Sequence, residues 1–133
     1  IFYPGALFLA DQGEILAGDE NEFGDGGVRI KAVTPDSSIT IGNAGRYMSG
    51  PDIMGRCVLG SGTQILGAVS VQNCALGAGE SYRHPDPNQR GGLFKGVGLA
   101  RNLTVGQGEV LSQRGAFEAS AVERQSVYHP PKA

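Results

Sequence analysis

Tryptophan is absent from this chain of 133 residues, and cysteine, methionine and histidine occur only twice each. Two cysteines with no histidine at a matching spacing predict no metal site. No apolar run approaches the roughly 20 residues that a membrane-spanning helix needs, and no segment resembles a signal peptide. The formal net charge of −2 favours neither nucleic acid nor an anionic membrane as a partner. We therefore expect a soluble, cytoplasmic protein that binds neither.

Glycine is the residue in excess, with 22 copies in the chain against a usual share of about 7 %. Hydrophobic residues still make up 40 % of the sequence, which argues against disorder. A chain of this length is large enough for one domain with a real core. Frequent glycine beside ample Ile, Leu and Val predicts a single domain over 1–133 whose backbone turns very often.

Apolar residues recur at steps of six over the middle of the chain. The series comprises Ile41, Tyr47, Ile53, Leu59, Ile65 and Val71. After a slip of one residue it resumes at Leu76, and it returns later as Val105, Leu111 and Phe117. A step of six is the period of neither an α-helix nor a simple alternating strand. It is the signature of a hexapeptide β-helix, in which each hexapeptide supplies a short strand and a turn.

An apolar or small residue followed by glycine marks the start of each repeat. These starts are Ala17, Ile41, Leu59, Leu76 and Val105, at spacings of 24, 18, 17 and 29 residues. Three hexapeptides make about 18 residues, so the natural unit is one coil with three sides. The longest spacing implies about eleven residues inserted after Leu76. We predict one long loop insertion over about 80–102 and a C-terminal cap over about 119–133, where the repeat ends.

A column of inward-facing residues would test this register. Two positions before each repeat start stand Ile15, Ile39, Cys57, Cys74 and Leu103. Stacked coils would place neighbours in this column about 4.8 Å apart. Cys57 and Cys74 would then lie on adjacent coils, either as two buried free thiols, as a reducing compartment favours, or as a disulfide.

The repeat resembles that of the bacterial transferase hexapeptide superfamily, which includes acyltransferases, γ-class carbonic anhydrases and the hexapeptide subunits of dynactin. The segment "GEILAGDENEFGDGGVRI" (13–30) is similar to a G-x-I-x-I-G-x-x-N coil of that superfamily, with Gly18 and Asn21 on motif positions. This resemblance implies an all-β fold, a single-stranded left-handed parallel β-helix of about six coils with one long loop insertion. It also implies a homo-oligomer, and a trimer is the expected assembly.

Acyl or acetyl transfer to a small substrate at a subunit interface is the first function that this resemblance implies. Such chemistry needs a general base within hydrogen-bond reach of the nucleophile, and His84 in the loop is the candidate, with Asp86 to orient it. The cofactor would be an acyl donor such as acyl-CoA. The candidates to contact its phosphates are Arg83, Arg90 and Lys95. An ordinary solvated loop is the competing interpretation of these residues.

Two other functions follow from the same resemblance. A zinc hydrolase of the γ-carbonic anhydrase kind needs three histidines, and only His84 and His129 are present, so we expect no zinc site. The alternative to acyl transfer is a non-catalytic binding or assembly module resembling dynactin-type hexapeptide proteins, with Tyr128 and His129 in a docking tail or an ordinary terminus. Close acidic residues form either a Ca²⁺ site or a solvated corner. They are Asp19, Glu20, Glu22 and Asp25.

Overall fold

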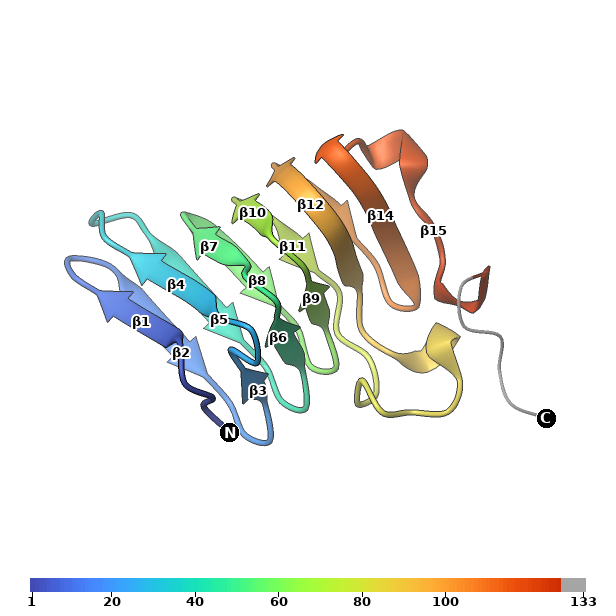
Figure 1. Ribbon diagram of the computed structural model, residues 1–133, viewed down its shortest axis with the longest axis horizontal. Coiled ribbons are helices and arrows are strands. Elements are labelled where there is room, and N and C mark those ends of the chain that lie inside the picture. Colours follow the sequence, from blue (N-terminus) through green and yellow to red (C-terminus); the bar gives the residue numbers. More distant parts are fainter. Residues whose placement is uncertain (128–133) are drawn as a thin grey trace.

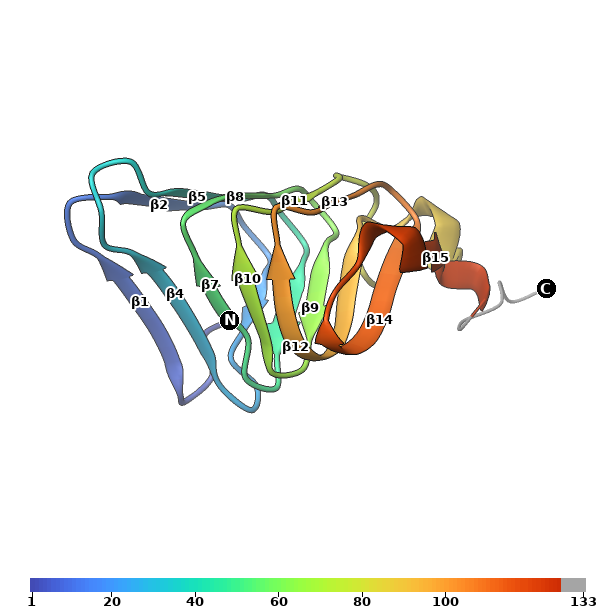
Figure 2. The same ribbon diagram turned by 90° about the horizontal axis from the view of Figure 1, so that it is seen from above.

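The β-strands of this protein stack in parallel along three faces, which together give a parallel β-helix-like fold (Figures 1 and 2). The computed structural model describes residues 1–127. The first face contains β1 (Ala6–Ala10), β4 (Val28–Ala32), β7 (Asp52–Met54) and β10 (Val69–Gln72). The second face contains β2 (Glu14–Ala17), β5 (Ser38–Ile41), β8 (Arg56–Leu59), β11 (Ala75–Leu76) and β13 (Thr104–Val105). The third face begins with β3 (Glu22–Phe23), β6 (Arg46–Met48) and β9 (Gln64–Leu66).

Two long strands turn the corner between the third face and the first. They are β12 (Leu93–Arg101) and β14 (Glu109–Ala116), which pair with each other in parallel. The beginning of β12 pairs with β9, and its end pairs with β10. The strand can bend at this corner because Gly96 and Gly98 adopt φ angles of 122° and 142°, which residues with a Cβ rarely reach. As a result, the first and third faces belong to one 10-stranded sheet.

The strand pairing confirms the register that the repeat predicts. Each predicted start pairs with the next along the second face, in the order Ala17, Ile41, Leu59, Leu76 and Val105. Along the third face the inward residues pair in the order Phe23, Tyr47, Ile65, Phe94 and Leu111. The side chains of this second series are all buried in the core. The spacing of apolar residues in the sequence therefore identifies the side chains that stack on one another.

The cysteine column lies where the spacing predicts. Ala75 pairs with Val58, so Cys74 and Cys57, which directly precede them, lie on adjacent coils. Both thiols are free and buried, and each Sγ donates to a backbone carbonyl oxygen at 3.3 Å. Desolvation raises the pKa of both thiols. The two cysteines therefore serve as small core residues, with their reactive thiolate form disfavoured.

The loop insertion is shorter than the sequence predicts. The prediction extended it over 80–102, but residues 93–101 form β12 and belong to the coil. The inserted residues lie between β11 and β12, at 77–92, and include the 3-10 helix η1 (Pro87–Gln89). The prediction was wrong because Gly96 and Gly98, which look like loop residues in the sequence, lie inside a strand that bends at a corner.

The last described residues fold across the final coil. After β14 follow η2 (Ala119–Ala121), β15 (Glu123–Arg124), which pairs antiparallel with β14, and η3 (Gln125–Val127). Gln125 is fully buried, and its Nε2 donates to Gly91 O at 2.6 Å and to Glu109 O at 3.0 Å. The rest of the predicted cap, with Tyr128 and His129, lies outside the described residues. Within residues 1–127, none of the helices has the length and apolar character needed to cross a membrane.

Candidate functional site

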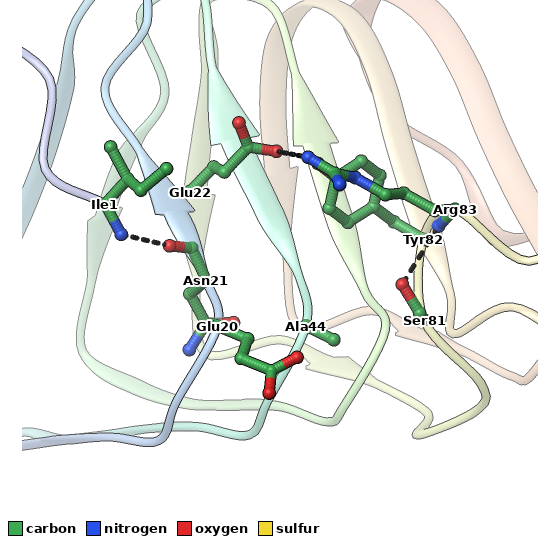
Figure 3. A pocket seen from close by; sticks show the side chains of 8 residues that line it. All are labelled: Ile1, Glu20, Asn21, Glu22, Ala44, Ser81, Tyr82 and Arg83. Atoms are coloured by element: carbon green, nitrogen blue, oxygen red, sulfur yellow. Dashed lines mark hydrogen bonds and ion pairs between the residues drawn. The ribbon is translucent and has the colours of Figure 1, made fainter.

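The inserted loop folds back along the coil and lies over the third face. Gly79 N donates to Ser61 O at 2.8 Å, and Tyr82 N donates to Ala44 O at 3.2 Å. Ser61 and Ala44 lie at corresponding corners of successive coils, before β9 and β6 respectively. The loop therefore runs toward the N-terminal coils and places Tyr82 and Arg83 beside Glu22 of β3 (Figure 3).

Two adjoining hollows lie beneath this part of the loop, with volumes of about 350 and 310 Å³. The first hollow, shown in Figure 3, is lined by Ile1, Glu20, Asn21, Glu22, Ala44, Ser81, Tyr82 and Arg83. The second is lined by Tyr3, Glu22, Asp25, Arg46, Met48, Tyr82 and Arg83. Glu22, Tyr82 and Arg83 line both hollows. Because the two hollows share these residues, we treat the hollows as one site and call it the loop cleft.

Glu22 is the acidic centre of the loop cleft. Its side chain is 18 % exposed, and its Oε2 lies 3.6 Å from Nη2 of Arg83, which is 74 % exposed. Tyr3 donates its hydroxyl to Oε1 of Glu22 at 3.1 Å, and this hydrogen bond, followed by the charge of Glu22, raises the pKa of Tyr3. The ion pair between Glu22 and Arg83 holds the loop only weakly, because an exposed pair contributes at most about 1 kcal/mol.

Arg46 is the basic centre of the loop cleft, and it forms no ion pair among the described residues. Its Nε and Nη2 donate to Oε1 of Gln64 at 3.2 and 2.8 Å. Its guanidinium carbon lies 4.8 Å from the ring centroid of Tyr82, within cation–π range. Strand pairing explains the position, because Glu22, Arg46 and Gln64 stand in one outward column of the third face. Arg46 is thus held rigidly while its other N–H donors stay available.

His84 is not among the residues that line the loop cleft. Its Nδ1 accepts the backbone N–H of Asp86 at 3.0 Å, and the carbonyl oxygen of Asp86 lies 3.3 Å from the same nitrogen. The shorter contact needs a lone pair on Nδ1, which places the proton of the neutral ring on Nε2. In that tautomer Nε2 is a donor and is not free to accept a proton. This geometry disfavours the predicted role of His84 as a general base.

Asp86 has a different role from the one that the sequence predicts. Its carboxylate was expected to orient the imidazole of His84, but Oδ1 instead accepts the backbone N–H of Asn88 at 3.0 Å. Asp86 thereby caps the first turn of η1, as short acidic side chains often do at helix starts. Its contact with His84 is made by the backbone alone.

The three predicted phosphate contacts do not converge on one site. Arg83 lines the loop cleft. Arg90 donates from Nε to His84 O at 2.8 Å and so holds the loop together; desolvation, followed by the nearby charge of Arg46, lowers its pKa. Lys95 is exposed on β12. Of the predicted set, the structure therefore brings only Arg83 to the cleft.

Sequence reasoning missed Tyr3, Arg46 and Tyr82. The signal for Arg46 was present, because Glu22, Arg46 and Gln64 each directly precede an inward residue of the third face. Polar residues in that position share one outward column, which the step of six could have identified. Tyr82 had no comparable signal, since its place over Arg46 depends on the path of the loop.

The acidic residues at 18–26 do not gather around one point. Glu22 is engaged with Tyr3 and Arg83, and Asp25 lines the second hollow. No group of three His, Cys, Asp or Glu side chains within residues 1–127 is placed to hold a metal ion.

Comparisons with known proteins assign neither a family nor a function to the chain. No protein-family model, curated protein sequence or solved structure matches the chain. The resemblance to hexapeptide proteins therefore depends on the repeat, and the structure extends it to an all-β fold of parallel, stacked strands.

Proposed function

We propose that the chain is a non-catalytic binding module, in which a rigid β-helix-like scaffold presents the loop cleft to a small ligand with a single anionic group. The observation that carries this proposal is the state of Arg46. Its guanidinium lines the cleft, is fixed by Gln64 and Tyr82, and has no carboxylate partner in the described chain. A fixed and unpaired guanidinium is the group that proteins use to bind carboxylate or phosphate.

The rest of the cleft limits what this arginine would accept. Glu22 and Asp25 line the same hollow as Arg46, so a ligand with several negative charges would be repelled. Tyr82 and Met48 supply the apolar part of the wall. A small ligand with one carboxylate or phosphate and a modest apolar body fits this combination of groups.

Acyl transfer receives less support from the geometry. The Nδ1 contact of His84 puts the proton on Nε2, and the carboxylate of Asp86 is occupied at η1. A transferase needs a general base beside a concave substrate site. The residues that line the loop cleft include Arg46 but no histidine. The binding module is the better supported of the two interpretations of the hexapeptide resemblance.

We also propose the finer features that this resemblance implies. These are a left-handed coil direction, about six coils, and a cytoplasmic homotrimer. The regular stacking of the three faces supports the comparison with hexapeptide proteins.

Titration followed by NMR tests the binding proposal. Sodium phosphate and sodium acetate are added separately to the full chain at constant ionic strength, and amide and guanidinium signals are followed. We expect saturable shifts around the cleft with a Kd of about 1–10 mM, as suits one anion held by one arginine. Arg46→Gln should weaken binding at least about fivefold. Arg29→Gln is the matched control, because Arg29 is exposed on β4, on the first face.

Two results would contradict the proposal. One is the absence of saturation in the wild-type chain, and the other is equal weakening by Arg46→Gln and Arg29→Gln, which would indicate general charge screening. Release of free CoA thiol from acetyl-CoA is measured in parallel with small amines and alcohols. Turnover that His84→Ala abolishes would favour the transferase instead.

A further inference from the structure

Glu22 and Arg46 are direct neighbours on the third face, yet they form no ion pair with each other. Strand pairing sets Glu22 of β3 opposite Arg46 of β6. Neighbouring strands lie about 4.8 Å apart, and opposite charges that face each other across them normally attract. The ion pairs within residues 1–127 are Lys31–Asp52 and Glu22–Arg83, and Arg46 belongs to neither. The sheet therefore holds two opposite charges side by side without pairing one with the other.

Other contacts hold each of these two side chains. Glu22 accepts the hydroxyl of Tyr3 and extends toward Arg83 of the loop (Figure 3). Arg46 donates from Nε and Nη2 to Gln64 on the next strand. Both side chains line the second hollow of the loop cleft, whose volume is about 310 Å³. This volume is at the lower end of the range of about 300–1,000 Å³ for ligand pockets, so it suits a ligand of amino-acid size.

A second carboxylate, that of Asp25, lines the same hollow. Asp25 is exposed in the turn after β3, and it forms no ion pair among the described residues. Its backbone oxygen accepts the N–H of Ser49 at 2.8 Å, which fixes the turn against the next coil. The hydrogen bond to Glu22 and the charge of Glu22, and then the charge of Asp25, raise the pKa of Tyr3. Both carboxylates thus act on the same side of the hollow, near the Tyr3 hydroxyl.

The charges that line this hollow cancel one another. They belong to Arg46, Arg83, Glu22 and Asp25. A ligand with a negative charge alone is attracted by the two arginines but repelled by the two carboxylates. A ligand with one charge of each sign is attracted by both pairs. The charge pattern therefore favours a ligand that is neutral as a whole and carries a positive group beside its anionic group.

We propose that the ligand of the loop cleft is an amino acid with an apolar side chain, bound as a zwitterion. Its carboxylate accepts hydrogen bonds from Arg46, and its ammonium group donates to Glu22 and Asp25. Its side chain contacts Met48 and Tyr82, which supply the apolar part of the wall. The carboxylate end is the anionic group already assigned to Arg46, so the zwitterion rests on the proposed function and adds the second charge to it.

Three ligands of matched shape test the two charges separately. Leucine carries both charges at neutral pH, isocaproate is leucine without the ammonium group, and isopentylamine is leucine without the carboxylate. Each is titrated into the full chain at constant ionic strength, and amide and guanidinium signals are followed by NMR. Leucine should bind at least about fivefold more tightly than either analogue, because each analogue leaves one sign of charge in the hollow without a partner. Isocaproate that binds as tightly as leucine would overturn the proposal.

Substitution of Asp25 tests the contact with the ammonium group. Asp25→Asn should weaken leucine binding at least about threefold but tighten isocaproate binding, because the lost charge attracts the first ligand and repels the second. Asp11→Asn is the matched control and should change neither affinity, since Asp11 is exposed between β1 and β2, at the corner of the first and second faces. Circular dichroism checks that each variant is folded. Weakening of both ligands by Asp25→Asn, or no change in either, would also overturn the proposal.

The same titrations distinguish failure of the zwitterion from failure of the proposed function. If isocaproate and phosphate saturate the wild-type chain and lose affinity in Arg46→Gln, but leucine binds no more tightly, the cleft is an anion site and only the zwitterion is excluded. If leucine, isocaproate and phosphate all fail to saturate, the proposed function fails and the zwitterion fails with it. Isopentylamine that binds as tightly as leucine, with no effect of Arg46→Gln, would indicate a site for cations alone and contradict both.

Discussion

Arg46 and Tyr82 join the coil to the inserted loop, with the guanidinium carbon 4.8 Å from the centre of the tyrosine ring. Arg83, the next residue in the loop, lies 5.3 Å from the same ring centre and donates from Nε to the Tyr82 hydroxyl at 2.8 Å. One aromatic ring therefore contacts two guanidinium groups, of which only that of Arg83 has a carboxylate partner among the described residues.

Substitution of Tyr82 should separate the effect of its ring from that of its hydroxyl. Tyr82→Ala removes the cation–π contact with Arg46 and is expected to weaken phosphate binding about fivefold, or ~1 kcal/mol. Tyr82→Phe keeps the ring and should change binding less than about twofold, although it removes the hydrogen bond from Arg83. NMR titration measures both. Equal losses in the two variants would show that the hydroxyl, and not the ring, supports binding.

Neutralising Glu22 should strengthen anion binding. Glu22→Gln removes a negative charge from the cleft and releases Arg83, so phosphate binding is expected to tighten about threefold at low salt and less at high salt. The pKa of Tyr3 should fall toward its ordinary value, because Glu22 is the main cause of its elevation. Ultraviolet titration of tyrosine measures this change. Glu14→Gln on β2 is the control and should alter neither property. An unchanged phosphate affinity in Glu22→Gln would contradict the electrostatic account.

Two glycines with positive φ angles should tolerate alanine very differently. Gly67 and Gly27 have φ angles of 119° and 94°. A Cβ on Gly67 would collide with the carbonyl oxygen of Gly96 on the next coil, whereas nothing lies within 4 Å of a Cβ on Gly27. Gly27→Ala should cost only the backbone strain of about 1–2 kcal/mol. Gly67→Ala should add about 1–3 kcal/mol for the collision. Urea denaturation measures the free energy of unfolding of both variants. Equal losses of stability would show that the close approach of the next coil does not exclude a side chain at position 67.

The buried thiols should make stability depend on pH in the alkaline range. Burial raises the pKa of Cys57 and Cys74, so above the ordinary thiol pKa of about 8.5 the unfolded chain loses protons that the folded chain retains. The free energy of unfolding should therefore be unaffected by these groups below that pH and fall as pH rises above it. Urea denaturation between pH 7 and 9.5 measures the slope. The Cys57→Ala/Cys74→Ala variant should show a smaller slope. A slope identical to that of the wild type would show that groups other than the two thiols cause the pH dependence.

Reactivity provides a separate check on the same pair. Both thiols are expected to resist a thiol reagent such as dithionitrobenzoate at pH 8 in the folded chain and to react fully in urea. Their place in the core was predicted from the sequence, since Cys57 and Cys74 stand two positions before successive repeat starts. Rapid reaction of one thiol in the native protein would contradict its burial.

The interior of the fold could be predicted from the sequence more fully than its surface. The stacked series from Ala17 to Val105 and the cysteine column follow from spacing, because each coil brings residues about 18 positions apart into register. The predicted C-terminal end of the insertion was wrong, because β12 continues through Gly96 and Gly98. These two glycines let the strand bend at a corner. Of the predicted site residues only Arg83 lines the loop cleft, because the others lie on parts of the loop and of β12 that do not reach it.

The sequence by itself determined the three-sided repeat, the inward residues and the point at which the loop leaves the coil, because these depend on a period that local chemistry repeats. Only the tertiary structure decided that the loop folds back over β3 and β6 and that Arg46 meets Tyr82. Those contacts join residues that no repeat relates. They depend on the path of a loop whose hydrogen bonds are made with coils far from it in the sequence.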